Sequence, residues 1–166
     1  MNTRRLMLAV ALGIGLSGAG ATVYAQHHHQ VAANQEPQPA AMGADTRVLV
    51  QFPEHMRIHT LTNMRDHLLA ISEIQEALSK GLLDKAADIA EQRLGMTSLI
   101  AHGAHDLSPF MPQGMQDIGT SMHHNASQFA VEVQNSAVTG DMKPALAALS
   151  RTTQACVACH ASYRLQ

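Results

Sequence analysis

The chain has 166 residues, and its 11 Lys and Arg against 13 Asp and Glu give a net charge of −2 with neutral histidines. This balance excludes the strongly basic surface that nucleic-acid binding requires. There is no Trp, and two Tyr and three Phe supply little aromatic surface for a core, whereas Met and His are frequent.

Residues 1–25 have the pattern of a secretory signal peptide. Arg4 and Arg5 precede an apolar run, and small residues end at Ala25. The apolar run is short for a membrane span, which argues against an uncleaved anchor. We therefore expect cleavage after Ala25, export to a periplasm, and a mature chain of about 140 residues with no membrane span. Loss of the two arginines leaves nine basic residues against 13 acidic ones, a net charge of −4.

Residues 26–47 form a polar segment that contains two prolines and no periodicity, so we expect a disordered arm ahead of one domain at 48–166. The run His27, His28 and His29 could bind copper or nickel, if cleavage leaves a free amine two residues before His28. The simpler interpretation, a solvated tail, is favoured because such compositional signals are loose.

Helical spacing of apolar residues predicts four helices and no strand in this domain. Short links between helices of this length favour an all-α, antiparallel up-down-up-down four-helix bundle. On the first helix the predicted core stripe consists of Leu61, Met64, Leu68, Ile71 and Leu78. The predicted ranges are about 53–80, 84–102 and 113–138, and a fourth helix runs from about 141 through residues 156–160. Asp84 is the predicted cap of the second helix and Asp141 that of the fourth.

The last helix ends in Cys156-Val-Ala-Cys159-His160, and these are the only cysteines in the chain. Cys-x-x-Cys-His is the attachment pattern of c-type haem, in which both thiols bind the macrocycle and the histidine ligates the iron. A dithiol redox pair would normally lie in a βαβ pattern, and a structural zinc site needs two further ligands. We therefore expect one covalent haem c per chain, held by Cys156 and Cys159, with His160 as axial ligand. A large apolar cofactor would also offset the shortage of aromatic core residues.

With this motif near the C-terminus of the last helix, the chain resembles the class II c-type cytochromes, that is, cytochrome c-prime and its low-spin relatives. The resemblance extends over residues 50–166 and includes Tyr163-Arg164 after the motif and the Gly140-Asp141 turn before the last helix. It implies that a residue of the first helix faces the iron opposite His160. The His- and Met-rich connection between the second and third helices departs from the family.

Met64 is the predicted sixth ligand. In an antiparallel bundle, His160 lies 19 residues after Asp141, and 19 residues before Lys80 is Leu61. Because side chains lean toward the N-terminus of their own helix, the level of His160 corresponds to residues 61–67. Met56 lies about 12 Å too far along the axis, since each helical residue rises about 1.5 Å.

Other histidines of the first helix compete less well. His59 lies at the margin of the predicted level, whereas His67 has the right level but falls beside the predicted stripe. The sequence therefore leaves three outcomes open, namely Met64, His67 or no protein ligand opposite His160.

These expectations describe a periplasmic one-electron carrier rather than an enzyme, since the haem supplies the redox chemistry. The resemblance also implies an alternative, a five-coordinate protein that binds nitric oxide or carbon monoxide. It allows a homodimer through the first two helices, as in class II relatives. The redox partners and the reduction potential are not readable from the residues.

A weaker alternative is a copper-handling protein, because imidazole and thioether groups are suitable copper ligands. The opposing interpretation is that the methionines pack on the haem and the histidines are exposed or hydrogen-bonded, and it is favoured because the residues lack tight clustering. The residues concerned are His102, His105, Met111, Met115, Met122, His123 and His124.

Overall fold

The computed structural model describes residues 43–166, and these residues are mostly helical (77%), which confirms the expected all-α class at that level. The signal peptide predicted at 1–25 and the arm residues 26–42 lie outside the described residues. No helix among residues 43–166 is long and apolar enough to cross a membrane.

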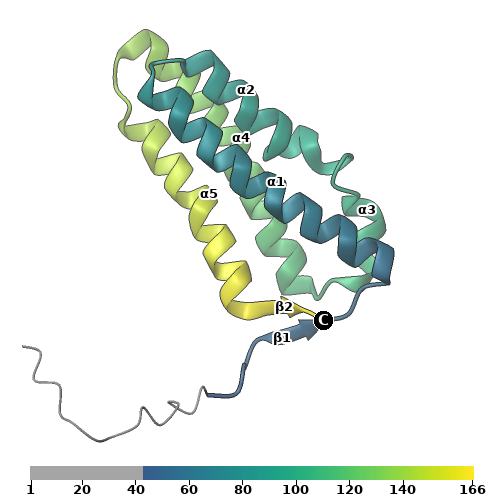
Figure 1. Ribbon diagram of the computed structural model, residues 1–166. Coiled ribbons are helices and arrows are strands. Elements are labelled where there is room, and N and C mark those ends of the chain that lie inside the picture. The colour runs from purple at the N-terminus through teal and green to yellow at the C-terminus, as the bar shows by residue number, and fades with distance from the viewer. Residues whose placement is uncertain (1–42) are drawn as a thin grey trace, which may run out of the picture. The chain divides into compact units, whose positions relative to one another are not determined.

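Two short strands flank the helices in the chain (Figure 1). In chain order the elements are β1 (Val48–Val50), α1 (Glu54–Ser79), α2 (Leu83–Arg93), the 3₁₀ turn η1 (Met96–Leu99), α3 (Ala104–Leu107), the 3₁₀ turn η2 (Ser108–Phe110), α4 (Gln113–Thr139), α5 (Lys143–Ser162) and β2 (Tyr163–Leu165). The most extensive packing is α4 against α5, followed by α2 against α4 and against α1.

Glycines stop two of the long helices where the sequence predicts. Gly81 (φ 69°) follows α1 and Gly140 (φ 75°) follows α4, both in the left-handed conformation that glycine adopts without steric cost. Helix α5 begins at Lys143 with Met142 at the N-cap, so Asp141, the predicted cap, lies one residue before the N-cap. Its carboxylate still accepts a hydrogen bond from the Lys143 amide at 3.0 Å.

The second predicted helix is shorter than expected, which corrects the range 84–102. Helix α2 ends at Arg93, and it begins at Leu83, so Asp84 lies inside its first turn and is not its N-cap. After Leu94 the chain turns at Gly95 into η1, where side chains from outside the turn accept two amide hydrogen bonds. Ser127 Oγ accepts the Met96 amide at 2.9 Å, and Glu91 Oε1 accepts the Thr97 amide at 3.2 Å.

The expectation of no strand is also wrong. Strands β1 and β2 pair in parallel, with Val48 opposite Tyr163. The Gln166 side chain extends this link, since it accepts the Phe52 amide at 3.1 Å and donates to the Phe52 carbonyl at 2.6 Å. Each strand has only three residues, so neither shows an alternating pattern long enough to detect.

The fully buried residues of α1 differ from the predicted stripe, of which Ile71 and Leu78 pack partly buried against the core. The buried residues of α1 are Thr60, His67, Ala70, Ile74 and Ala77. In contrast, Leu68 is 73% exposed and Met64 is 36% exposed. The small residues Ala70 and Ala77 join an alanine-rich core with α2, α4 and α5, whereas Met64 and Leu68 border a cavity.

Two apolar clusters lie apart from each other. The larger one joins α1, α2, α4 and α5 around Phe129, Ile74 and Val133. The smaller one consists of Val50, Phe52, Leu107 and Met115, and Cys159, Tyr163 and Leu165 pack against it. The β1–β2 pair therefore fastens the N-terminal end of the described chain beside the end of α5.

Candidate functional site

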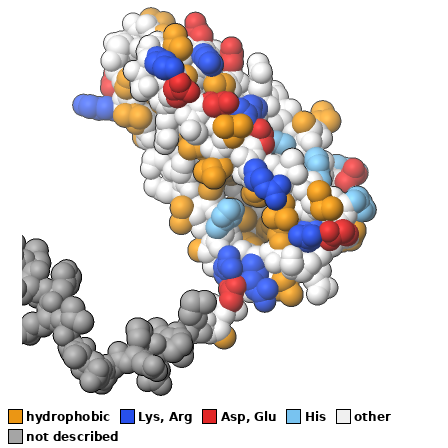
Figure 2. Space-filling model, in the orientation of Figure 1, with side chains coloured by type: hydrophobic (Ala, Val, Ile, Leu, Met, Phe, Trp, Pro, Cys, Tyr) orange, Lys and Arg blue, Asp and Glu red, His pale blue; other side chains and the backbone are white. Residues whose placement is uncertain are grey.

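A cavity of about 810 Å³ lies between α1, α4, α5 and the connection from α2 to α4. Its wall is mainly apolar, and it contains methionines from three parts of the chain, Met64, Met111, Met115 and Met122. Figure 2 shows apolar side chains exposed on the face between α1 and α5, with basic side chains nearby. A volume of this size falls within the range of about 300–1,000 Å³ that is usual for ligand and cofactor pockets.

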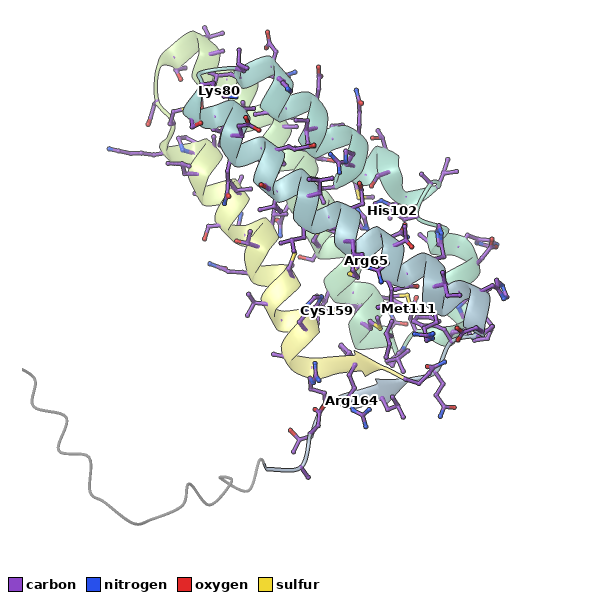
Figure 3. The ribbon with its side chains drawn as sticks, viewed as in Figure 1. Arg65, Lys80, His102, Met111, Cys159 and Arg164 are labelled. Carbon is purple, nitrogen blue, oxygen red and sulfur yellow. The ribbon has the colours of Figure 1, made fainter. Side chains whose placement is uncertain are left out.

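The three motif residues, Cys156, Cys159 and His160, all line this cavity from the last turns of α5. Figure 3 shows Cys159 on the α5 side, with His102 and Met111 on the side of the α2–α4 connection. Both cysteines are half-buried and free of disulfide bonds. Helical spacing places them about one turn apart on the same wall.

Burial raises the pKa of both thiols, so they are protonated at neutral pH. They also lie near the C-terminal end of a helix, whereas reactive thiolates are typically stabilised at helix N-termini. This environment disfavours a dithiol redox pair. It suits thiols that are consumed in a covalent attachment.

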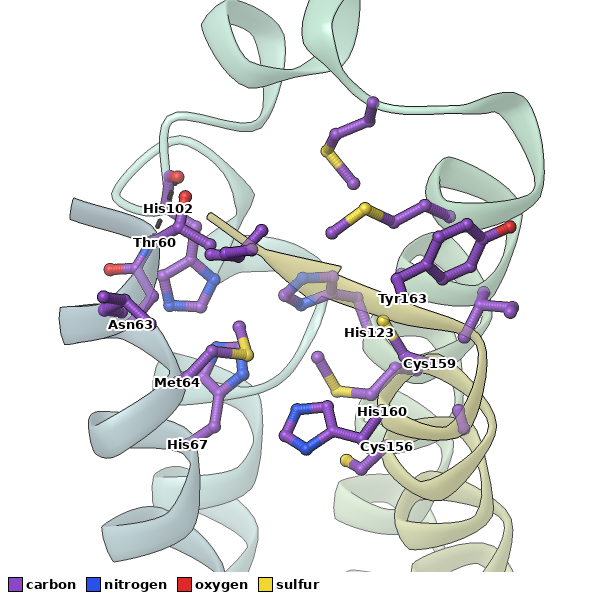
Figure 4. A pocket seen from close by; sticks show the side chains of 18 of the residues that line it. Thr60, Asn63, Met64, His67, His102, His123, Cys156, Cys159, His160 and Tyr163 are labelled. Atoms are coloured by element: carbon purple, nitrogen blue, oxygen red, sulfur yellow. Dashed lines mark hydrogen bonds between the residues drawn. The ribbon is translucent and has the colours of Figure 1, made fainter. Parts of the chain in front are cut away.

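Met64 and His67 line the opposite wall, on α1. In the close view of Figure 4, the Met64 side chain extends from α1 toward the side from which the His160 ring extends. Neither Met56 nor His59 belongs to the lining. Met56 packs instead against the smaller apolar cluster, and the His59 ring lies near Gly103.

The structure brings together three histidines that are distant in the sequence. His67 comes from α1, His102 from the segment between η1 and α3, and His123 from α4. The ring centroids are 4.7 Å apart for His67 and His102, 5.9 Å for His67 and His123, and 5.3 Å for His102 and His123. All three residues line the cavity, so the cluster forms part of its wall.

Burial is the main cause that lowers the pKa of all three histidines, and for His67 it lowers the pKa to about 4. The rings are therefore neutral at pH 7. Their mutual electrostatic repulsion as cations acts in the same direction for His67, because His102 and His123 both lie near it. Beside them, Arg93 forms ion pairs with Glu73 and, at 2.5 Å, with Asp66.

The sequence did not predict this cluster. His67 was expected beside the core stripe of α1, but it is buried at 8% exposure and lies on the inner face. A stripe drawn through Thr60, His67, Ile74 and Ala77 has helical spacing and would have indicated it. The other histidines of the proposed copper set, His105 and His124, are exposed.

Two arginines line the edge of the cavity near the strand pair, Arg47 and Arg164. Asp45 pairs with Arg47 at 2.7 Å and lies 3.4 Å from Arg164 Nε, a buried atom that makes no hydrogen bond. The hydrogen bonds from Arg47 lower the pKa of Asp45 to about 2. This edge of the cavity therefore carries guanidinium groups that suit an anionic substituent.

A comparison of the chain with protein-family models, with curated proteins and with solved structures found no match in any of the three.

Proposed function

We propose that this protein is a periplasmic mono-haem c-type cytochrome that carries one electron between partner proteins. The observation that carries the proposal is the position of Cys156, Cys159 and His160 in the wall of a large apolar cavity, with Met64 on the wall across from them. The export signal expected at residues 1–25 also supports the proposal, because a protein with a c-type haem attachment motif is expected in an exported compartment.

The residues that surround the cavity fit a haem group. The volume of about 810 Å³ and the mainly apolar wall suit a macrocycle, and the exposed side chains of Leu68 and Val157, which also line the cavity, would be covered by it. Arg47 and Arg164 line the cavity and would supply cationic partners for the propionate groups. When bound, the haem supplies reversible one-electron chemistry at the iron.

The chain itself would attach and orient the group. The thiols of Cys156 and Cys159 would hold it covalently, the His160 imidazole would ligate the iron from α5, and the Met64 thioether would ligate it from α1. The methionines and leucines around the cavity exclude water. No acid, base or nucleophile is assigned a role in converting a substrate, so the proposal is an electron carrier and not an enzyme.

The proposal includes the up-down-up-down bundle of the class II cytochromes, with the haem site near the C-terminal end of the last helix. The packing of α4 between α2 and α5, and of α2 against α1, supports this arrangement. The parallel pair of β1 and β2 is an addition to four helices rather than a departure from them.

The test is to express the full chain in bacteria that contain the c-type cytochrome maturation machinery. We expect the periplasmic product to start at Gln26 and to retain haem after acid-acetone extraction, at one haem per chain by mass spectrometry. The double variant Cys156→Ser, Cys159→Ser should carry no covalent haem. Recovery of all haem in the organic layer from the wild-type protein would refute the proposal.

A further inference from the structure

We propose that His67, His102 and His123 bind a divalent first-row transition-metal ion, at a site separate from Cys156, Cys159 and His160. The three imidazoles come from three different segments, and the fold brings their rings together in the wall of the cavity (Figure 4). The three histidines line the same cavity, but none of them is a haem ligand in the proposed function, so the site does not depend on that proposal.

The spacing of the rings is that of a three-histidine metal site. With metal–nitrogen distances of about 2.0–2.1 Å and tetrahedral angles, ring centres lie roughly 5 Å apart. The observed centroid separations are 4.7, 5.3 and 5.9 Å. Three histidines and one open position also form a common ligand set of zinc.

Hydrogen bonds set the tautomers of two of the rings. The Ser98 hydroxyl donates to the Gly95 carbonyl at 2.7 Å, so its oxygen can accept from His102 Nδ1, 3.3 Å away. His123 Nδ1 donates to the Leu94 carbonyl at 2.7 Å. The proton of His123 is therefore on Nδ1, and the same tautomer of His102 fits its contact with Ser98. In this tautomer the lone pair of Nε2 is left for a ligand. A metal-binding histidine typically makes this kind of bond with its other nitrogen.

The third ring has a buried nitrogen without a partner. His67 is only 8% exposed, and its Nε2 atom is inaccessible to solvent and makes no hydrogen bond. Leaving a buried polar atom unpaired costs about 1–3 kcal/mol, so such atoms call for a physical reason. A metal ion bound to Nε2 would satisfy it.

Protonation does not compete with a metal ion for these imidazoles at neutral pH. Metal ligation requires neutral imidazoles, and burial keeps all three neutral at pH 7 by lowering their pKa. The nearest carboxylate, Asp66, is already paired with Arg93. The donor set is therefore three nitrogens, which suits zinc or copper(II) rather than calcium or magnesium.

Binding must move the His67 side chain. As the side chains stand within residues 43–166, no group of three or more His, Cys, Asp or Glu residues could hold a metal ion. The Nδ1 contacts hold the rings of His102 and His123, whereas the Nε2 atom of His67 makes no hydrogen bond. The His67 ring can turn about its Cβ–Cγ bond, because that torsion is broad in histidine.

The experiment uses the full protein as purified, in a background where His27, His28 and His29 are replaced by Ala to remove the terminal histidine run. After treatment with a chelator, the protein is dialysed against Zn²⁺, and bound zinc is measured by elemental analysis. The variants are His67→Gln, His102→Gln and Ser98→Ala. The matched control is the double variant His105→Gln, His124→Gln, which removes two exposed histidines from the same part of the fold.

We expect one zinc per chain in the wild-type background and in the control. His67→Gln and His102→Gln should each weaken binding by more than the roughly 10- to 100-fold that the loss of an outer partner costs, and Ser98→Ala should weaken it within that range. Absence of stoichiometric zinc in the wild-type background would overturn the proposal, as would unchanged binding in His67→Gln.

X-ray absorption spectroscopy of zinc-loaded wild-type protein keeps the proposal testable if a variant fails to fold. We expect nitrogen ligands with the scattering pattern of three imidazoles. Sulfur in the first coordination sphere would place zinc on Cys156 and Cys159 and overturn the site. That result would also show that the cysteines carry no haem, so failures of the two proposals are distinguishable.

Discussion

His67 and Met64 are one helical turn apart on α1, yet their environments differ. Met64 borders the cavity and remains 36% exposed, whereas His67 is buried at 8% exposure among other imidazoles. A thioether is a soft ligand that needs no second hydrogen bond, but an imidazole inside a protein needs a partner for each nitrogen. This difference assigns Met64 to the iron in our proposal and His67 to the histidine cluster.

Replacing Met64 by Ala should convert the iron from low spin to high spin, because the sixth ligand would be lost. The reduced variant should then bind carbon monoxide rapidly, and its reduction potential should fall, since Met/His ligation raises the potential. Absorption spectroscopy and potentiometry measure these changes. Met56→Ala is the matched control and should keep the low-spin spectrum.

The same spectra separate the alternatives. A high-spin wild-type protein that binds carbon monoxide at once would favour the five-coordinate interpretation. A low-spin Met64→Ala protein, combined with loss of the low-spin spectrum in His67→Gln, would identify His67 as the ligand.

The neutral state of His67 should make the chelator-treated protein less stable in acid. The pKa of His67 is about 4 in the folded state against about 6.5 when unfolded, so between these values the unfolded chain binds more protons. The free energy of unfolding should therefore fall as the pH decreases from 6.5 to 4, by about 3 kcal/mol at most for this group. His102 and His123 contribute in the same direction.

Urea unfolding at a series of pH values measures this dependence. His67→Gln should reduce its slope over this range. The double variant His105→Gln, His124→Gln should retain the wild-type slope. An unchanged slope in His67→Gln would contradict the role of burial.

At the level of the elements, the chain between α2 and α4 determines where the histidines meet. The early end of α2 at Arg93, the turn η1 and the left-handed Gly103 place His102 beside α1, where Asn63 donates a hydrogen bond to the His102 carbonyl at 3.2 Å. A continuous helix through residue 102 would not have made this bend.

Gly103→Ala should destabilise the protein by about 1 kcal/mol, because φ is +65° and an L-residue with a Cβ is strained there. The added Cβ would also lie 3.4 Å from His59 Nε2. Chemical denaturation followed by circular dichroism measures the loss. Gly103→Asn adds the same Cβ but tolerates the left-handed region better, so it should lose less. Equal losses in the two variants would attribute the effect to the contact with His59 instead of the backbone.

In the described domain as a whole, the main hydrophobic core is packed without any contribution from the cavity. Phe129, Ile74 and Val133 are buried in the alanine-rich cluster, and none of them lines the cavity. The cavity wall, in contrast, includes exposed Leu68 and Val157. The helices therefore have a packed core of their own. A group bound in the cavity would cover the exposed apolar side chains between α1 and α5 and so stabilise the folded state.

Protein produced without covalent haem, from the Cys156→Ser, Cys159→Ser variant, should remain helical but unfold at a lower temperature. We expect the midpoint to fall by roughly 10 °C, since a group that binds only the folded state stabilises it. Circular dichroism and binding of a hydrophobic dye to the open cavity check this. Wild-type protein expressed without the maturation machinery is the control, and its unfolding midpoint should be lowered as in the double variant. An unchanged midpoint would contradict a haem-filled cavity.

Local patterns in the sequence were sufficient for several features of the fold. Helical spacing predicted α1, α4 and α5 nearly to their ends, and Gly81, Gly140 and Asp141 marked helix boundaries, because glycine geometry and end capping depend on adjacent residues. The motif from Cys156 to His160 predicts covalent haem attachment from five adjacent residues alone. The haem itself stays a prediction.

Only the tertiary structure decided which face of α1 is buried and which residues meet across the chain. The inner face carries His67 and small alanines, and the larger Met64 and Leu68 border the cavity, so a ranking by hydrophobicity did not identify the fully buried residues. The strand pair and the histidine cluster join segments far apart in sequence. Such contacts depend on how helices pack and where a chain bends, which the periodicity of any single segment does not contain.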